Sequence, residues 1–193
     1  MSFLGLAPVG APDEAVVELL EEQLPGAFGI PVRRLAPLPE PAGALDPARG
    51  QWSSADFLRL LLKGVPPGTV RLLGLTGRDL FVPVLSFVFG QAQLGGPVAV
   101  ISLARLDPSF HGLPPDPELK GARALKEAVH ELGHTFGLVH CPDPSCPMSL
   151  SIDIRQLDAK SARLCEGCAV LLKESPHMNR EPRTAVASKG AGR

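Results

Sequence analysis

Three histidines, a glutamate and a glycine follow the spacing H-E-x-x-H-x-x-G-x-x-H between residues 130 and 140. His130 and His134 are four positions apart, so on a helix both imidazoles can reach one zinc ion at about 2.0–2.1 Å. Glu131 is rotated away from both, and its carboxylate can act as general base on a water that the metal activates. The three residues therefore predict hydrolytic zinc chemistry.

Two histidines do not complete such a site, and a straight helix would carry a later histidine away from the metal. Gly137 can end the helix in the left-handed conformation and turn the chain, so that His140 returns as the third ligand. A fourth position then stays open for water and substrate, as in catalytic zinc sites. H-E-x-x-H alone also arises by chance in helices, but the extended motif is far more specific.

All four cysteines of the chain lie just downstream of this motif, with four residues inside the first pair and two inside the second. They are Cys141, Cys146, Cys165 and Cys168. This grouping predicts a structural zinc site made of four thiolates. The competing interpretations are two disulfides, or a redox motif formed by the CEGC pair.

His140 and Cys141 are consecutive, and in extended backbone their side chains point to opposite sides. Each can therefore serve a different metal, which predicts two zinc ions, one on each side of that peptide bond. The alternative is a swap, in which His140 joins three cysteines and Cys141 binds the catalytic zinc.

The elements that must position these residues follow from periodicity and from turn residues. Helices are predicted over 13–24, begun by Asp13 and ended by Pro25-Gly26, over 53–64, with Ser53 or Ser54 as cap and Gly64 as stop, and from about 118 to 136. Strands are predicted over 27–35, 70–77, 85–94 and 97–106, and residues 38–50 read as a loop. The last two strands flank Gly95-Gly96, which predicts an antiparallel pair with 85–94 at the sheet edge.

The predicted helix near residue 130 has one apolar stripe, on the side away from His130 and His134, so these are not ordinary core histidines. Strands that alternate with helices indicate an α/β or α+β fold with a twisted mixed sheet. The chain has 193 residues, enough for one domain, expected over 1–173. Residues 174–193 have no periodicity and are expected to form a disordered tail.

Composition limits the classes of partner. The formal net charge is −1 and no basic stripe occurs, which argues against nucleic acid and anionic membrane. The longest apolar runs are strand-sized, and the first residues lack the charged start of a signal peptide. We therefore expect a cytoplasmic protein whose partner is a peptide or a protein.

The run HELGHTFGLVHCPDPSCPMSLSIDIRQLDAKSARLCEGC, residues 130–168, resembles the archaemetzincin pattern, in which a metzincin zinc motif is followed at once by a four-cysteine zinc site. RGQW, DLFVPVLSFVFGQA and KEAV upstream are also similar to that family, so the resemblance spans most of the chain.

The resemblance implies a compact metzincin-like zinc peptidase, acting as an aminopeptidase or endopeptidase and expected to be a monomer. His130, His134 and His140 would bind the catalytic zinc, Glu131 would be the general base, and the four cysteines would bind a structural zinc. Met148 would form the Met-turn, the methionine-containing turn beneath the metal. The edge strand near residues 86–93 would pair with an extended peptide substrate, as in β-augmentation.

The chain departs from several other metzincins in having no tyrosine, a residue that they use near the developing oxyanion. Zinc or another donor must then carry that charge. His111 is a weak candidate, since a solvated loop histidine is the simpler interpretation. Arg123, Lys126 and Glu127 read as polar helix positions, although Lys126 and Glu127 share the histidine side and could orient the ligands.

Two other functions compete with hydrolysis. A zinc-stabilised peptide-binding or scaffold protein could have the same ligands, but it has no need for a base at Glu131. A redox protein using CEGC would need thiols that are free of metal.

Overall fold

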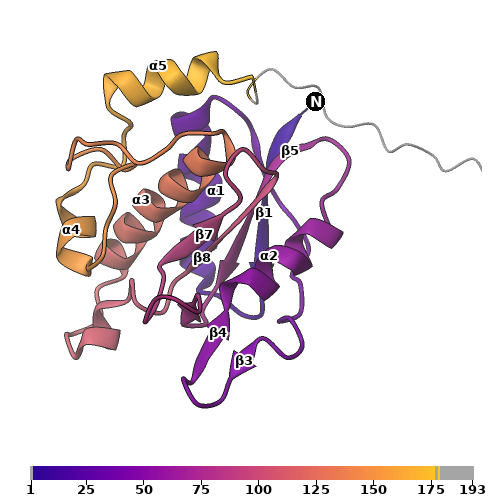
Figure 1. The fold of residues 1–193 in the computed structure, drawn as a ribbon, viewed down its shortest axis with the longest axis vertical. Coiled ribbons are helices and arrows are strands. Elements are labelled where there is room, and N and C mark those ends of the chain that lie inside the picture. The colour runs from indigo at the N-terminus through magenta and orange to yellow at the C-terminus, as the bar shows by residue number, and fades with distance from the viewer. Residues whose placement is uncertain (1, 177, 179–193) are drawn as a thin grey trace, which may run out of the picture.

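A five-stranded mixed sheet forms the centre of the fold in this computed structural model, which describes residues 2–176 and 178 (Figure 1). The strands are β1 (Phe3–Val9), β2 (Val32–Arg34), β5 (Thr69–Thr76), β7 (Gly90–Ala92) and β8 (Val98–Ser102), in the order β2-β1-β5-β8-β7. The first four strands of that order are parallel, and β7 pairs with β8 in antiparallel fashion at one edge.

Both faces of the sheet are buried, which explains why its central strands are nearly continuous apolar runs. Alternate residues enter two different clusters: Leu73 and Leu75 of β5 pack with α1 (Glu14–Phe28) and α3 (Pro117–Thr135). Leu72 packs on the other face with Phe57 and Leu61 of α2 (Ser54–Lys63). The sheet therefore separates two helical layers.

Shorter elements make up the rest of the secondary structure in the described part of the chain. A small second sheet contains β3 (Leu45–Asp46), β4 (Gln51–Ser53) and β6 (Leu80–Phe81). A 3₁₀ helix, η1, spans Pro108–His111, and the last two helices are α4 (Ile154–Ala159) and α5 (Glu166–Glu174). Both of these helices lie on the α3 side of the molecule (Figure 1).

The predicted fold class is confirmed, with the H-E-x-x-H helix packed on a twisted mixed sheet. Four details of the sequence prediction are wrong. The first helix does not end at Pro25 but continues to Phe28, because the buried side chains of Leu24 and Phe28 hold another turn against the core. The predicted strand over 27–35 contracts to Val32–Arg34, and part of the predicted loop over 38–50 pairs as β3.

The predicted edge strand over 85–94 is also shorter than expected, since only Gly90–Ala92 is a strand. Two carbonyl groups ahead of it accept hydrogen bonds from side chains instead of a neighbouring strand. Arg49 Nη1 donates to Leu85 O at 3.0 Å, and Gln51 Nε2 donates to Ser86 O at 2.9 Å. Its antiparallel pairing with β8 and its position at the sheet edge are confirmed.

The tail predicted over 174–193 lies almost entirely outside the described residues. Within the part of the chain that the structure covers, none of the helices is long and apolar enough to cross a membrane.

Candidate active site and zinc centres

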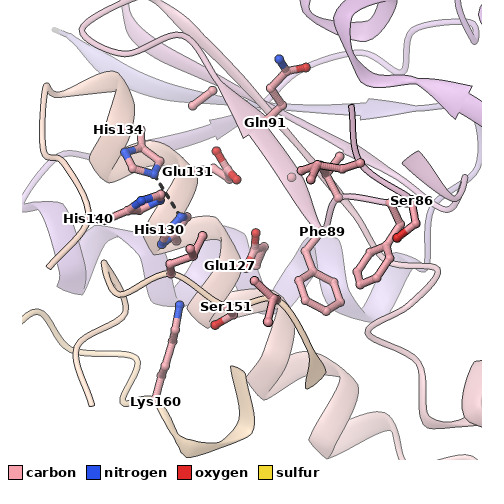
Figure 2. Close-up of a pocket in the computed structure, with 17 residues that line it drawn as sticks. Ser86, Phe89, Gln91, Glu127, His130, Glu131, His134, His140, Ser151 and Lys160 are labelled. Carbon is pink, nitrogen blue, oxygen red and sulfur yellow. Dashed lines mark hydrogen bonds between the residues drawn. The ribbon is translucent and has the colours of Figure 1, made fainter. Parts of the chain in front are cut away.

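Helix α3 carries the first two histidines. It begins at an N-cap, Asp116, whose side chain accepts the Leu119 N–H at 2.9 Å, and Pro117 occupies its first turn. One helical turn separates His130 from His134, and their Nε2 atoms lie 3.0 Å apart (Figure 2). Two ligands of one tetrahedral zinc would lie about 3.3 Å apart, given bonds of about 2.0–2.1 Å.

The second ring nitrogens identify the tautomers. His130 Nδ1 lies 2.7 Å from Pro147 O, and His134 Nδ1 lies 2.8 Å from Leu138 O. A carbonyl can only accept, so each Nδ1 donates and each Nε2 keeps a lone pair. The 3.0 Å approach of the two Nε2 atoms is therefore the spacing of two metal ligands rather than a hydrogen bond. These residues fit a metal ion.

Gly137 turns the chain after α3, with φ at +94°. Its N–H donates to His134 O at 2.9 Å, and the Leu138 N–H donates to Gly133 O at 3.0 Å, which closes the helix end. The turn brings back His140, and the ligand atoms of the three histidines lie within 4.8 Å of one another. The sequence prediction that Gly137 brings His140 into the cluster is confirmed at the level of geometry.

The carbonyl end of α3 is held by two further donors. Arg71 Nε donates to Thr135 O at 2.9 Å, and its guanidinium lies over the Phe136 ring. Gly95, in the turn between β7 and β8, donates its N–H to His134 O at 2.9 Å. The edge hairpin and the active-site helix are thereby fixed to each other.

Burial sets the protonation of the two histidines on α3. It lowers the pKa of His130 to about 3, and it also lowers the pKa of His134, so both rings are neutral near pH 7. Neutral imidazole is the form that binds zinc.

Glu131 lies beside the histidines and is only 5% exposed. Burial, together with the neighbouring Glu127 carboxyl, raises the pKa of Glu131 well above its usual range. Burial likewise raises the pKa of Glu127 to about 7. A carboxyl group with a raised pKa can both take up and return a proton, which is the property required of a general base and acid.

A cleft of about 360 Å³ opens over this cluster. Residues 85–92 and residues 150–152 line it, together with the α3 side chains and Lys160 (Figure 2). Leu85, Leu150 and Ile152 at its rim are exposed apolar side chains. The cleft is therefore largely apolar around a polar, metal-binding centre.

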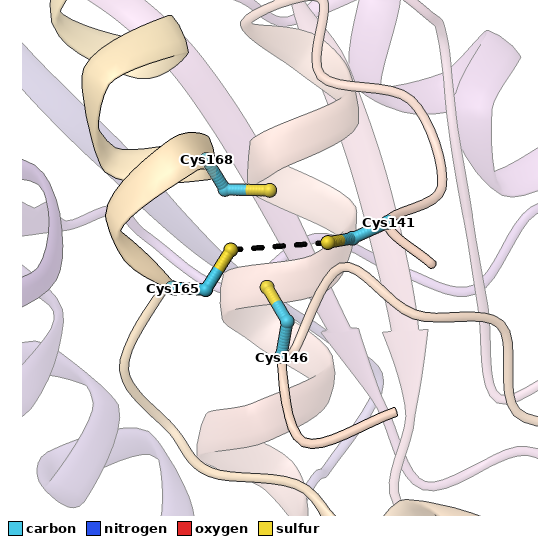
Figure 3. A group of neighbouring side chains, drawn as sticks. All are labelled: Cys141, Cys146, Cys165 and Cys168. Atoms are coloured by element: carbon cyan, nitrogen blue, oxygen red, sulfur yellow. Dashed lines mark hydrogen bonds between the residues drawn. The ribbon is translucent and has the colours of Figure 1, made fainter. Parts of the chain in front are cut away.

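The four cysteines form a second centre (Figure 3). Their Sγ atoms lie within 4.8 Å of one another, and Cys141 Sγ lies 3.8 Å from Cys165 Sγ. A tetrahedral zinc with bonds of about 2.3 Å places its thiolates about 3.8 Å apart. All four are free cysteines, so the disulfide interpretation is not supported. The Cys168 N–H at the start of α5 lowers the pKa of Cys165, which favours a thiolate there.

The histidine and cysteine groups are separate, so His140 and Cys141 do serve different clusters and the swapped arrangement is excluded by the geometry. Met148 is fully buried beneath the histidine-bearing helix. A Cβ built on Gly133 would lie 2.4 Å from Met148 Sδ, so the glycine within H-E-L-G-H makes room for this methionine.

Of the other polar residues considered from the sequence, only one lines the cleft. Glu127 lines the cleft, whereas Lys126 donates to Leu157 O at 3.3 Å and to Asp158 O at 2.8 Å, and Arg123 pairs with Asp158 at 2.7 Å. His111 lies in η1 with its Nε2 2.8 Å from Arg105 O and does not line the cleft.

Sequence reasoning missed two residues of the site. Lys160 is buried and lines the cleft, and Gly90 lies against Glu131. Neither has a signal in its local sequence, because both reach the site through the tertiary fold.

An H-E-x-x-H helix whose histidines are joined by a third beyond a glycine turn defines a zinc-dependent metallopeptidase. The sequence model of peptidase family M54 matches residues 67–174 of this chain. An archaemetzincin of Methanocaldococcus jannaschii is 40% identical over 169 residues, which cover 88% of this chain and 92% of the relative. The chain belongs to peptidase family M54, the archaemetzincins.

Solved structures agree with this assignment. The crystal structure of archaemetzincin from Methanopyrus kandleri matches with a TM-score of 0.77 at 38% identity, covering 92% of this chain and 97% of that one. The archaemetzincin structure from Archaeoglobus fulgidus matches with a TM-score of 0.74 at 34% identity, covering 87% of this chain and 98% of that one. The predicted zinc-dependent peptidase is confirmed, and the competing scaffold function gains no support from these relatives.

Proposed function

We propose that His130, His134 and His140 hold the catalytic zinc and that Glu131 is the general base. The observation that carries this assignment is the orientation of the imidazoles. Two of the rings donate through Nδ1 to backbone carbonyls, so their Nε2 lone pairs converge beside a buried carboxyl group. We assign the structural zinc to the four-cysteine group and the Met-turn to Met148.

A zinc ion held by these three histidines would supply a Lewis acid for the scissile carbonyl and would lower the pKa of a water molecule toward neutrality. Glu131 accepts the proton of the attacking water and then delivers it to the leaving amine. The buried position of Glu131 and its raised pKa favour the second step, because the carboxyl holds the proton until the amine can take it.

The substrate is proposed to be a peptide in extended conformation along β7. This strand is the last in its sheet, so its outer edge offers backbone groups for pairing. The strand directly adjoins α3, since Gly90 lies against Glu131. The apolar rim of Leu85, Leu150 and Ile152 favours apolar side chains on the bound peptide.

We propose that the enzyme is cytoplasmic and monomeric. Four reduced thiols that serve as metal ligands fit a reducing compartment. Residues of a single chain line the cleft and form both ligand groups, so the site needs no partner subunit. We further propose that residues 1–173 form one peptidase domain.

Cleavage of a diverse peptide library by the zinc-loaded protein, read by mass spectrometry, tests this function. The expected result is a set of cuts that disappears when zinc is removed by chelation and returns when zinc is restored. Cuts near the amino terminus would identify an aminopeptidase, and internal cuts an endopeptidase. A library left intact by the fully zinc-loaded protein would contradict the proposal.

A further inference from the structure

Lys160, a buried lysine, reaches the active site from the end of α4. Lys160 is only 5% exposed, and its side chain lines the proposed catalytic cleft. The ammonium end of the side chain is directed toward His130 (Figure 2). It donates to Pro147 O at 3.2 Å and also donates to Ser149 O. The two acceptors flank Met148, so one ammonium group binds the turn on both sides of that methionine.

The same turn positions a zinc ligand. Pro147 O is the carbonyl that accepts the Nδ1–H of His130 at 2.7 Å, so His130 and Lys160 share one acceptor. Between them, Met148 O accepts the N–H of Cys141 at 3.0 Å. Movement of this turn would therefore change the orientation of the His130 ring.

The charge of Lys160 also matters at this position. Burial lowers its pKa, while the acidic groups of Glu127, Cys146 and Glu131 oppose that effect. A buried cation costs free energy unless negative charge and hydrogen bonds compensate for it. Here two carbonyls and nearby carboxyl groups supply that compensation, and the ammonium in turn opposes the negative charge beside the catalytic base.

We propose that Lys160 is a positioning residue for hydrolysis: its ammonium fixes the Pro147–Ser149 turn that orients His130 and balances the Glu127 and Glu131 carboxyl groups at the cleft. This role rests on the proposed catalytic site. It assigns Lys160 to the active centre even though it does not bind the metal or touch the reacting atoms.

The test compares Lys160→Met, which removes charge and donors, with Lys160→Arg, which keeps both. Lys160→Gln, which keeps a donor and loses the charge, is prepared beside them in case the methionine variant does not fold. Lys126→Met is the matched control, because Lys126 also donates to two backbone carbonyls, at 3.3 and 2.8 Å, but lies outside the cleft. Folding is checked by thermal unfolding.

Zinc content is measured across a series of zinc buffers, independently of any peptide, and kcat and KM are then determined. Lys160→Met, or Lys160→Gln in its place, is expected to need about 10- to 100-fold more free zinc to fill the three-histidine site. It should also lower kcat more than it changes KM. Lys160→Arg should recover most of both losses, and Lys126→Met should match the parent.

Parental zinc affinity and kcat in a folded Lys160→Met or Lys160→Gln variant would overturn the proposal, and so would an equal loss in Lys126→Met. If the zinc-loaded parent cleaved no peptide, the proposed function would fail, whereas the zinc titration would still decide the role of Lys160 in positioning His130.

Discussion

Gly90 of the edge strand and Glu131 of helix α3 are in such close contact that no side chain fits between them. A Cβ built on Gly90 would lie 2.6 Å from Glu131 Cγ, 2.8 Å from its Oε1 and 2.8 Å from Val100 O. The strand proposed to hold the peptide therefore also forms the wall against which the proposed base lies.

Replacing Gly90 by alanine should displace the Glu131 carboxylate, since Val100 O is backbone and cannot yield easily. We expect Gly90→Ala to lower kcat by about 10-fold or more, because small errors in the placement of a catalytic group are costly. Zinc content should remain at two ions per chain. Steady-state peptide hydrolysis with parallel zinc analysis provides the measurement.

Gly26→Ala is the control for this variant, because a Cβ at Gly26 in helix α1 meets nothing within 4 Å. It should leave kcat unchanged. Full activity of Gly90→Ala would show that the base does not need its position against β7.

Gly133→Ala should disturb the turn below the metal, because the new Cβ would lie 2.4 Å from Met148 Sδ. We expect a destabilisation of about 1–3 kcal/mol from overpacking. In the double variant Gly133→Ala with Met148→Ala, part of this cost should vanish, because the clashing sulfur is gone. Denaturant unfolding of the parent, both single variants and the double variant measures this coupling; strict additivity would contradict it.

Cys168→Ser should remove one of the two zinc ions and lower stability by more than about 4 kcal/mol, since a structural metal stabilises only the folded chain. Burial raises the pKa of the Cys168 thiol, so this group becomes a thiolate readily only when metal is bound. Thermal unfolding under reducing conditions with zinc analysis tests this. Ser145→Ala, in the neighbouring loop, should keep both ions; a Cys168→Ser protein with two zinc ions and parental stability would refute the assignment.

An ion-pair cluster that shares no residue with the two ligand groups should make stability depend on pH. Lys120 Nζ lies 2.9 Å from both Asp13 and Asp107, and its hydrogen bonds lower the pKa of each carboxyl below the ordinary 3.8. For Lys120 itself, burial acts to lower the pKa, but the two aspartates outweigh burial and the net pKa is raised. Because the carboxyl pKa values are depressed, this stabilisation is present above pH 3.8 and is lost as pH falls through the folded-state values.

Lys120→Met should therefore cost about 1 kcal/mol at pH 7, a figure discounted for solvent screening because the Asp13 side chain is 38% exposed. The difference from the parent should shrink below about pH 4. Denaturant unfolding across this range, with exposed Lys63→Met as control, gives the comparison. A deficit that stays constant with pH would mean that the ion pairs are not its source.

Local sequence was sufficient to predict the proposed metal ligands because their geometry is local. His130 and His134 are one helical turn apart, and the left-handed Gly137 lies between them and His140, so spacing and turn chemistry determine the cluster. Within each cysteine pair the geometry is likewise local, since Cys141 and Cys146 flank a short loop and Cys165 and Cys168 lie at the start of α5.

The surroundings of the site could not be predicted in the same way. Lys160 reaches Pro147 through a loop and α4, and Gly90 meets Glu131 across 41 positions of chain. The edge strand was predicted too long because Arg49 and Gln51 bond to the carbonyls of Leu85 and Ser86, a contact that no periodicity reveals. Pro25 failed to end α1 because packing of Phe28 outweighed the lost hydrogen bond.

The assignment of Glu131 as the general base is tested most directly by comparing peptide hydrolysis by the parent and Glu131→Gln, each verified to hold two zinc ions per chain. Glutamine preserves the shape of the side chain and all seven metal ligands but cannot accept the proton. We predict a loss in kcat of about 10²- to 10⁴-fold with zinc content unchanged. Near-parental kcat in the zinc-loaded variant would contradict the account.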